Sequence, residues 1–248
     1  MKKLLTTAIL FTAALSPAQP PATAPALWQQ MLAVDASADH IASVRANFRQ
    51  EKFTPLMKKP LVSTGTIAAA GATSFWITDQ PEPTKMLVTD REIRLYYPNQ
   101  SAEEIYPIVG KLGSLASSPL PRLSVLREFF SFTQLPVGDL DPSGDDAHEL
   151  ALRLEPIDEQ MKQHVAEVRV LLERSSGLVK LAETIDPDGE KTRLTFTNVQ
   201  INLPLKSDDL KLDVPAGTSI SHPLEGLGDA SDGAAPIRAT TTPAGDAR

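Results

Sequence analysis

The chain has 248 residues, 42% of them hydrophobic, with a formal net charge of −7 and no cysteine. The acidic balance argues against nucleic acid and anionic membrane surfaces as partners. The lack of cysteine excludes disulfides, thiol catalysis and thiolate metal sites, so an exported domain of this chain depends on its hydrophobic core alone. The length suits one sizeable domain.

The first residues are ordered as in an export signal. Met1-Lys2-Lys3 is basic, Leu4–Leu15 is apolar, and small residues follow up to Ala18. An apolar run of this length is too short to span a membrane and is typical of a secretory signal peptide. We therefore expect residues 1–18 to be a signal peptide that is cleaved near Ala18. An export signal without disulfides or an acylated N-terminal cysteine indicates the periplasm of a Gram-negative bacterium.

Composition divides the rest of the chain into a linker, one domain and a tail. Residues 19–26 are rich in proline and alanine and predict a flexible linker. Residues 221–248 are rich in small and polar residues and predict a disordered tail. The domain, residues 27–220, begins with a short predicted helix, because Leu27 and Met31 share one helical face.

Alternating apolar and polar residues predict short strands between residues 43 and 108. Val44, Ala46 and Phe48 fall on one face of the first strand, and the residues between them are polar. A turn is expected at Gly71. Strands so close in sequence pair antiparallel, because parallel neighbours need a long crossover.

The middle of the chain predicts a helix. Leu123, Leu126 and Phe130 recur at helical spacing, with Val125 and Phe129 beside them. Prolines precede this run, where the start of a helix tolerates them.

Strands are expected to resume after a polar loop at residues 139–146. They include a hairpin whose Asp-Gly turn lies in residues 186–190, and ordered chain is expected to continue through residues 208–220. The whole pattern predicts an α+β, mainly β fold with one antiparallel sheet. Since a curved sheet with one apolar face needs a cover and the helices are the candidates, we expect an open or half-closed barrel with a helical plug.

Signals of enzymatic chemistry are few. The four histidines do not cluster, and the nucleophile-elbow, phosphate-loop and dinucleotide motifs are absent. The two acidic loops, residues 139–146 and 186–190, do not match a full calcium loop, and turn formation accounts for them. Glu103 and Glu104 are interpreted as strand residues that face two ways. We expect no enzymatic activity, no metal and no cofactor.

Apolar residues of the strands and the central helix form a candidate ligand-binding set. They either fill a dry core, as most such stripes do, or line a pocket for acyl chains between helix and sheet. The candidate residues are Val44, Phe48, Ile67, Trp76, Met86, Val88, Leu123, Leu126, Phe129, Phe130, Leu194 and Phe196.

Three stretches resemble the LolA-type periplasmic lipoprotein carriers. Residues 44–67, with VRANFRQ and a later Ser-x-Gly, are similar to the family's opening strands. Residues 75–98 are similar in a Trp-bearing strand, a proline turn, Leu-Val-x-Asp and a strand that ends in Tyr-Pro. Residues 196–220 resemble the family's closing Phe-x-Asn segment. The resemblance extends over residues 27–220.

The resemblance implies an unclosed antiparallel β half-barrel with a helical lid over an apolar cavity. It implies a chaperone of outer-membrane biogenesis that binds the acyl chains of lipoproteins, or of a related lipid, and ferries them from the inner to the outer membrane. Shielding is needed because each exposed methylene costs about 0.8 kcal/mol. The implied partners are the cargo, an inner-membrane releasing complex and an outer-membrane acceptor, and the carrier is expected to be a monomer.

One family feature is missing. In the best-known carriers an arginine followed by proline precedes the aromatic strand and bonds the lid, and its place here is Ala70, followed by Gly71. Trp76 matches the family's cavity-side aromatic residue. Another basic residue or packing alone is left to hold the lid, and the cargo is either a lipoprotein or another lipid.

Two other functions are compatible with the same pattern. One is an RseB-like regulatory module that senses lipid or lipoprotein without transporting it, although that group normally carries a second domain and the chain after Ile220 is short for one. The other is an enzyme acting on a lipid or envelope glycan, which would require turnover that depends on Glu103 or Glu104.

Overall fold

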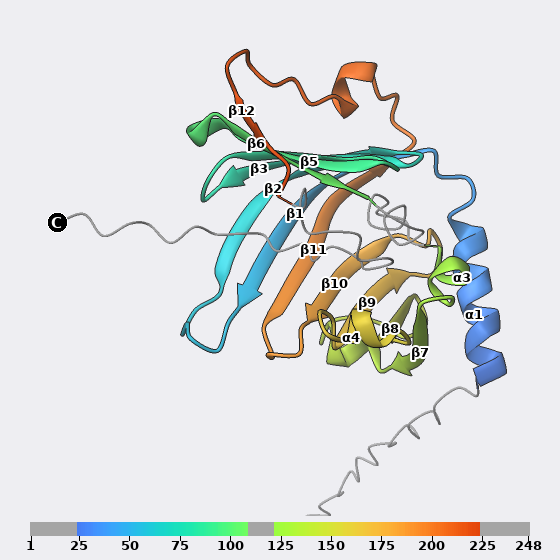
Figure 1. The fold of residues 1–248 in the computed structure, drawn as a ribbon. Coiled ribbons are helices and arrows are strands. Elements are labelled where there is room, and N and C mark those ends of the chain that lie inside the picture. Colours follow the sequence, from blue (N-terminus) through green and yellow to red (C-terminus); the bar gives the residue numbers. More distant parts are fainter. Residues whose placement is uncertain (1–23, 109–121, 224–248) are drawn as a thin grey trace, which may run out of the picture.

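A computed structural model describes residues 24–108 and 122–223 (Figure 1). The predicted signal peptide, most of the predicted linker and the tail from residue 224 lie outside the described residues. Among the helices of the described ranges, none combines the length and apolarity needed to cross a bilayer.

Twelve strands form a single sheet. They are β1 (Ser43–Phe53), β2 (Leu61–Ala70), β3 (Thr73–Gln80), β4 (Thr84–Val88), β5 (Glu92–Tyr97), β6 (Ala102–Pro107), β7 (Phe130–Leu135), β8 (Glu149–Pro156), β9 (Glu167–Glu173), β10 (Val179–Ile185), β11 (Lys191–Ile201) and β12 (Ser219–Ser221). Their order in the sheet is β12-β6-β5-β4-β3-β2-β1-β11-β10-β9-β8-β7.

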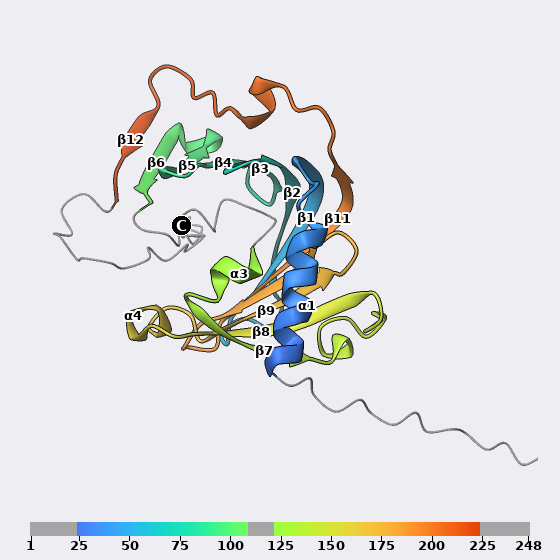
Figure 2. The same cartoon turned by 90° about the vertical axis from the view of Figure 1, so that its right-hand side faces the viewer.

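The sheet curves into an unclosed half-barrel whose edge strands are β7 and β12 (Figure 2). The predicted antiparallel meander is confirmed from β1 to β6, and the predicted turn at Gly71 is present, with φ +57°. The prediction of a purely antiparallel sheet is wrong at one edge. β12 pairs with β6 in parallel, because the chain returns to this edge through a long connection after β11.

The helices of the described residues are few. They are α1 (Ala24–Ser37), α3 (Leu123–Leu126), α4 (Glu159–Lys162) and the 3₁₀ turns η1 (Pro98–Gln100), η2 (Val137–Asp139) and η3 (Ser207–Leu210). All of them except α1 are three or four residues long.

Two predicted helix boundaries are wrong. α1 begins at Ala24, three residues before the predicted start and inside the predicted linker. The predicted central helix through Phe130 is a single turn, because the chain turns after Leu126 and Phe130 opens β7, opposite Pro156 of β8.

The main hydrophobic core lies between α1, α3 and the concave face of the sheet at strands β7–β10. We call this concave face, along the whole sheet, the inner face. Leu27, Met31 and Val34 of α1 pack in one cluster with Leu123 of α3 and with the strand residues. The strand members are Phe130, Leu150, Leu152, Leu154, Val170, Leu172 and Val179. In Figure 2 α3 lies inside the curve of the sheet and α1 beside it.

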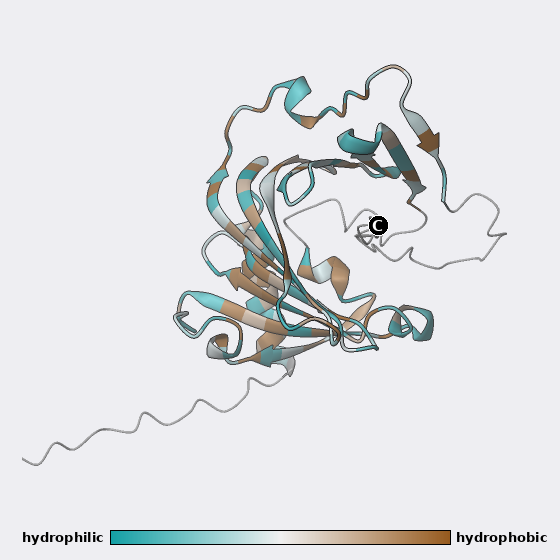
Figure 3. Ribbon diagram, turned by 90° about the vertical axis from the view of Figure 1, so that its left-hand side faces the viewer, coloured by the Kyte–Doolittle hydropathy of each residue, from teal (hydrophilic) through white to brown (hydrophobic). Residues whose placement is uncertain are grey.

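The outer face of the sheet is also covered, contrary to the expectation of one apolar face. Val137 and Leu140, in and after η2, pack against Ala151, Leu171 and Leu181. The segment after η3 crosses the outer face of the first meander, where Leu212 packs with Phe75, Leu87 and Tyr96 (Figure 3). The first half of β8, residues 149–152, is therefore buried on both faces.

Gly65 allows β2 to pass close to its neighbours. It lies opposite Phe48 of β1, at a register shift between β2 and β3. A Cβ atom on this residue would lie 1.9 Å from the carbonyl oxygen of Ile77 and 2.9 Å from Cε1 of Phe48. The glycine of the Ser-x-Gly motif therefore makes room for both a backbone carbonyl and an aromatic ring.

Gly65→Ala is expected to lower the free energy of unfolding by about 1–3 kcal/mol, because the backbone of β3 must move. Urea denaturation measures the change. Gly138→Ala is the matched control, since nothing lies within 4 Å of a Cβ atom there. Equal stability of the two variants would contradict the close contact.

Candidate functional site

Three aromatic side chains from separate strands meet on the inner face. The ring centroids of Phe48 and Trp76 lie 5.3 Å apart at an interplanar angle of 60°, and those of Trp76 and Phe196 lie 6.0 Å apart at 54°. Such tilted pairs suit the aromatic quadrupole. Trp76 Nε1 donates a hydrogen bond of 3.0 Å to Ser74 Oγ, so the indole's polar atom is satisfied within the protein. Trp76 itself is only half-buried.

The register brings eight of the predicted site residues to this face. Phe48 pairs with Phe196, Ile67 with Trp76, and Trp76 with Met86. The eight residues are Val44, Phe48, Ile67, Trp76, Met86, Val88, Leu194 and Phe196.

The other four predicted site residues belong to the inner core. Leu123 and Phe130 are buried there, and Leu126 and Phe129 pack against them. Phe196 also packs against this core, so it connects the two halves of the predicted set. Leu123 is 0% exposed, which makes it a core residue in this conformation. An acyl-binding role for the twelve residues stays a prediction.

A row of inner-face residues leads from the aromatic cluster across the sheet to strand β6. Trp76, Met86, Leu95 and Glu104 pair in register across β3, β4, β5 and β6. With about 4.8 Å between strands, Glu104 lies about 14 Å from Trp76 along the sheet. The row is apolar up to its last member.

Glu104 is held by two tyrosines, Tyr97 and Tyr106, that were not among the predicted site residues. Its Oε2 accepts hydrogen bonds from Tyr97 Oη at 3.0 Å and from Tyr106 Oη at 2.8 Å. Burial, and then the hydrogen bond to Glu104, raise the pKa of Tyr106 above its ordinary value, so this hydroxyl stays protonated and remains a donor. The spacing Tyr-x6-Glu-x-Tyr, which runs from the end of β5 through the η1 turn into β6, could have indicated the cluster.

Glu103 and Glu104 face opposite sides of the sheet, as predicted for neighbours in a strand. Glu103 is 1% exposed and pairs on the outer face with Arg94, whose Nη2 lies 2.6 Å from Oε1. The two carboxylates therefore do not form a pair for general acid–base catalysis.

A buried carboxylate joins α1 to α3. Asp35, 8% exposed, accepts the backbone N–H of Leu123 at 2.8 Å and that of Ser124 at 2.9 Å. Arg122 adds a hydrogen bond of 3.0 Å to the Asp35 carbonyl and an ion pair of 2.6 Å with Asp39. Among the described residues, Arg122 and Asp35 therefore attach the α3 turn to α1. We call them the α1–α3 clamp.

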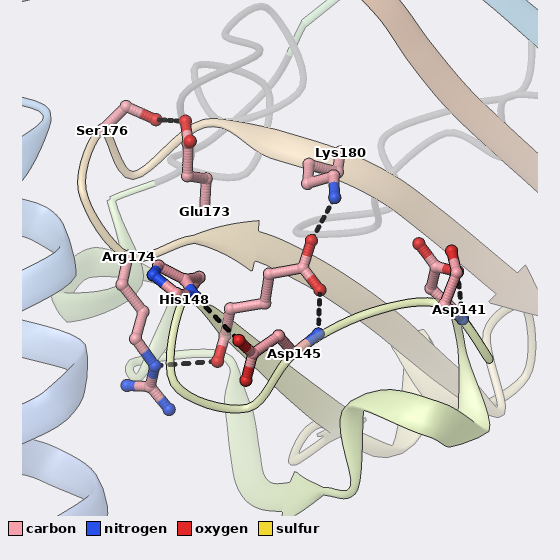
Figure 4. A network of polar contacts seen from close by, with 9 residues as sticks. Asp141, Asp145, His148, Glu173, Arg174, Ser176 and Lys180 are labelled. Atoms are coloured by element: carbon pink, nitrogen blue, oxygen red, sulfur yellow. Dashed lines mark hydrogen bonds and ion pairs between the residues drawn. The ribbon is translucent and has the colours of Figure 1, made fainter.

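A second polar network fixes the other half of α1. Arg174 Nη1 donates to Gln30 Oε1 at 2.9 Å, and its Nε donates to the carbonyl of Glu149 at 2.7 Å (Figure 4). Burial lowers the pKa of Arg174. The buried Glu149 carboxylate in turn pairs with Lys180 and accepts the N–H of Asp145. The clamp at Asp35 and this network at Gln30 together hold α1 at two points along its length.

The acidic loops use their carboxylates for turn formation. Asp141 Oδ1 accepts from the N–H and hydroxyl of Ser143, which lowers the pKa of Asp141. Asp186 Oδ1 accepts the N–H groups of Asp188 and Glu190. Within residues 24–108 and 122–223 no group of three or more His, Asp or Glu side chains could hold a metal ion.

A groove of about 560 Å³ lies on the outer face, away from the aromatic cluster. It runs between β1–β3 and η3, and the ion pair of Arg45 with Asp209, at 2.6 Å, lies on its wall. The hydrogen bond from Arg45 lowers the pKa of Asp209. Ile67, one of the predicted site residues, also lines this groove, whereas Phe48, Trp76 and Phe196 do not.

Asp35→Ala is expected to lower the free energy of unfolding by about 1–3 kcal/mol, because two N–H groups of α3 lose their acceptor. Urea denaturation measures the loss, and faster hydrogen exchange at the amides of Leu123 and Ser124 locates it. Asp39→Ala is the control, since it removes only an exposed ion pair and should have little effect. Equal losses in the two variants would contradict the clamp.

No family model matches the chain, and no curated protein matches it. Solved structures do resemble it. An uncharacterized conserved protein from Thermus thermophilus has a TM-score of 0.49 at 11% identity, over 79% of this chain and 98% of that chain. A LolA superfamily protein from Nitrosomonas europaea has a TM-score of 0.39 at 12% identity, over 75% and 97%.

A chain of the Pseudomonas aeruginosa MucA/MucB complex has a TM-score of 0.42 at 12% identity, over 75% of this chain and 60% of that chain. The LolA superfamily, which the sequence resembles, is thus among the structural neighbours. At these identities the likeness concerns the fold alone.

Proposed function

We propose that this protein is a periplasmic carrier that binds the acyl chains of a lipoprotein, or of a related lipid, on the inner face of its half-barrel. It ferries them from the inner to the outer membrane, and α1 and α3 act as the cover of the site. The proposal includes no catalytic step.

The observation that carries the proposal is the half-buried Trp76 on a concave apolar wall. Its ring lies between Phe48 and Phe196, and its Nε1 is already bonded to Ser74. A tryptophan whose polar atom is satisfied offers its remaining exposed surface to an apolar ligand. Burial of acyl methylenes there contributes about 0.8 kcal/mol each.

A carrier must also release its cargo, which requires a cover that separates from the sheet. The cover here is small: α3 is one turn long and is held to α1 by the clamp. Such a short element can move without unfolding the sheet. Leu123, Leu126, Phe129 and Phe130 would then exchange contacts with core residues for contacts with the ligand.

The test is lipid mass spectrometry on protein exported to the periplasm and purified without detergent. Trp76→Asp places a charge on the inner wall, so we expect a lipopeptide or diacyl lipid to co-purify with the wild type and to fall at least tenfold in this variant. The identity of the lipid separates a lipoprotein carrier from a general lipid shuttle.

Leu56→Asp is the matched control, since Leu56 is 96% exposed in the β1–β2 loop and the substitution adds the same charge. It should retain the lipid. The proposal is wrong if the wild type carries no lipid and takes up no added acyl probe, in which case the inner face is a dry core.

A further inference from the structure

Glu104 is the only charged side chain on the inner face of the described strands β3 to β6. The register places only uncharged residues at the other inner-facing positions of these strands. A carboxylate on such a surface loses much of its hydration and is stable only with hydrogen-bond donors or a counter-charge.

Tyr97 and Tyr106 form hydrogen bonds with only one oxygen of the Glu104 carboxylate. Both tyrosine hydroxyls bond to Oε2, at 3.0 and 2.8 Å. Among the described residues, no hydrogen bond or ion pair reaches Oε1, and no Lys or Arg pairs with Glu104. The half-buried carboxylate therefore has a fixed orientation, and its Oε1 is an acceptor that no described residue uses.

The chemistry that complements this arrangement is a protonated amine. An ammonium group supplies the missing positive charge and donates N–H bonds to Oε1, and charge-assisted bonds of this kind are about twice as strong as neutral ones. A phosphate or carboxylate in the same place would be repelled. Tyr97 and Tyr106 already donate to Oε2, so they hold the carboxylate rather than compete for its free oxygen.

The position of Glu104 also sets the orientation of a ligand. It ends the row that starts at Trp76, and Met86 and Leu95 fill the roughly 14 Å between them. A polar head at Glu104 therefore leaves the acyl chains to lie along Leu95 and Met86 toward the aromatic cluster.

We propose that Glu104, held by Tyr97 and Tyr106, binds the ammonium of an amine-bearing lipid head group, so that the carrier selects aminolipids. This inference rests on the proposed function, because it assigns the head-group end of the same site. It adds a preference that acyl binding alone does not require.

The test is calorimetric titration of the full chain with two single-chain lipids below their micelle concentrations. Lysophosphatidylethanolamine and lysophosphatidylglycerol of equal chain length share the phosphate and differ in the terminal amine. We expect the wild type to bind the ethanolamine lipid about tenfold more tightly. Glu104→Gln keeps an acceptor for the tyrosines and removes the charge, so it should bind both lipids equally.

Glu82→Gln is the matched control, since this carboxylate is exposed in the β3–β4 loop and its loss changes the net charge equally. It should keep the tenfold preference. Glu104→Lys is a second variant and should reverse the preference. Thermal unfolding verifies that each variant is folded.

The outcomes separate the two proposals. Equal binding of both lipids by the wild type, or an unchanged preference in folded Glu104→Gln, overturns the head-group assignment and leaves acyl binding in place. Failure of the wild type to bind either lipid overturns both.

Discussion

The pairing of β1 with β11 is the interaction on which the rest of the structure depends. Residues 44–53 lie beside residues 191–201, and this contact joins the meander β1–β6 to the meander β7–β11. Neither meander can form the concave wall alone, because Phe48 and Trp76 come from the first and Phe196 from the second. The ladder therefore forms only after a loop of about 140 residues has closed, which makes the site a product of long-range folding.

Local alternation was enough to predict the strands other than β7 and β12, and the face of most site residues. Val44, Phe48 and Trp76 lie on the inner face because strand periodicity places them there whatever the tertiary contacts. The central helix could not be predicted, since Phe129 and Phe130 fit both a helical stripe and the start of a strand, and only the pairing of Phe130 with Pro156 decides between them. The clamp was not predictable either, because Asp35 and Leu123 are 88 residues apart.

The inner and outer faces of the sheet are stabilised in different ways. The inner face of β7–β10 is covered by α1 and α3 through an apolar core and a few polar anchors, among them the buried Asp35 and the half-buried Arg174. The inner face of β3–β6 has no described helix against it. Trp76 and Glu104 lie on this half of the wall.

The segment after β11 has a consequence for solubility. It crosses the outer face with Leu212 over Phe75, Leu87 and Tyr96, and it ends as β12, which pairs with β6. An uncovered β6 would present free N–H and C=O groups to other chains, next to a newly exposed aromatic surface. The described residues that follow β11 thus cover strand β6 and keep this edge of the unclosed sheet from adding a strand of another molecule.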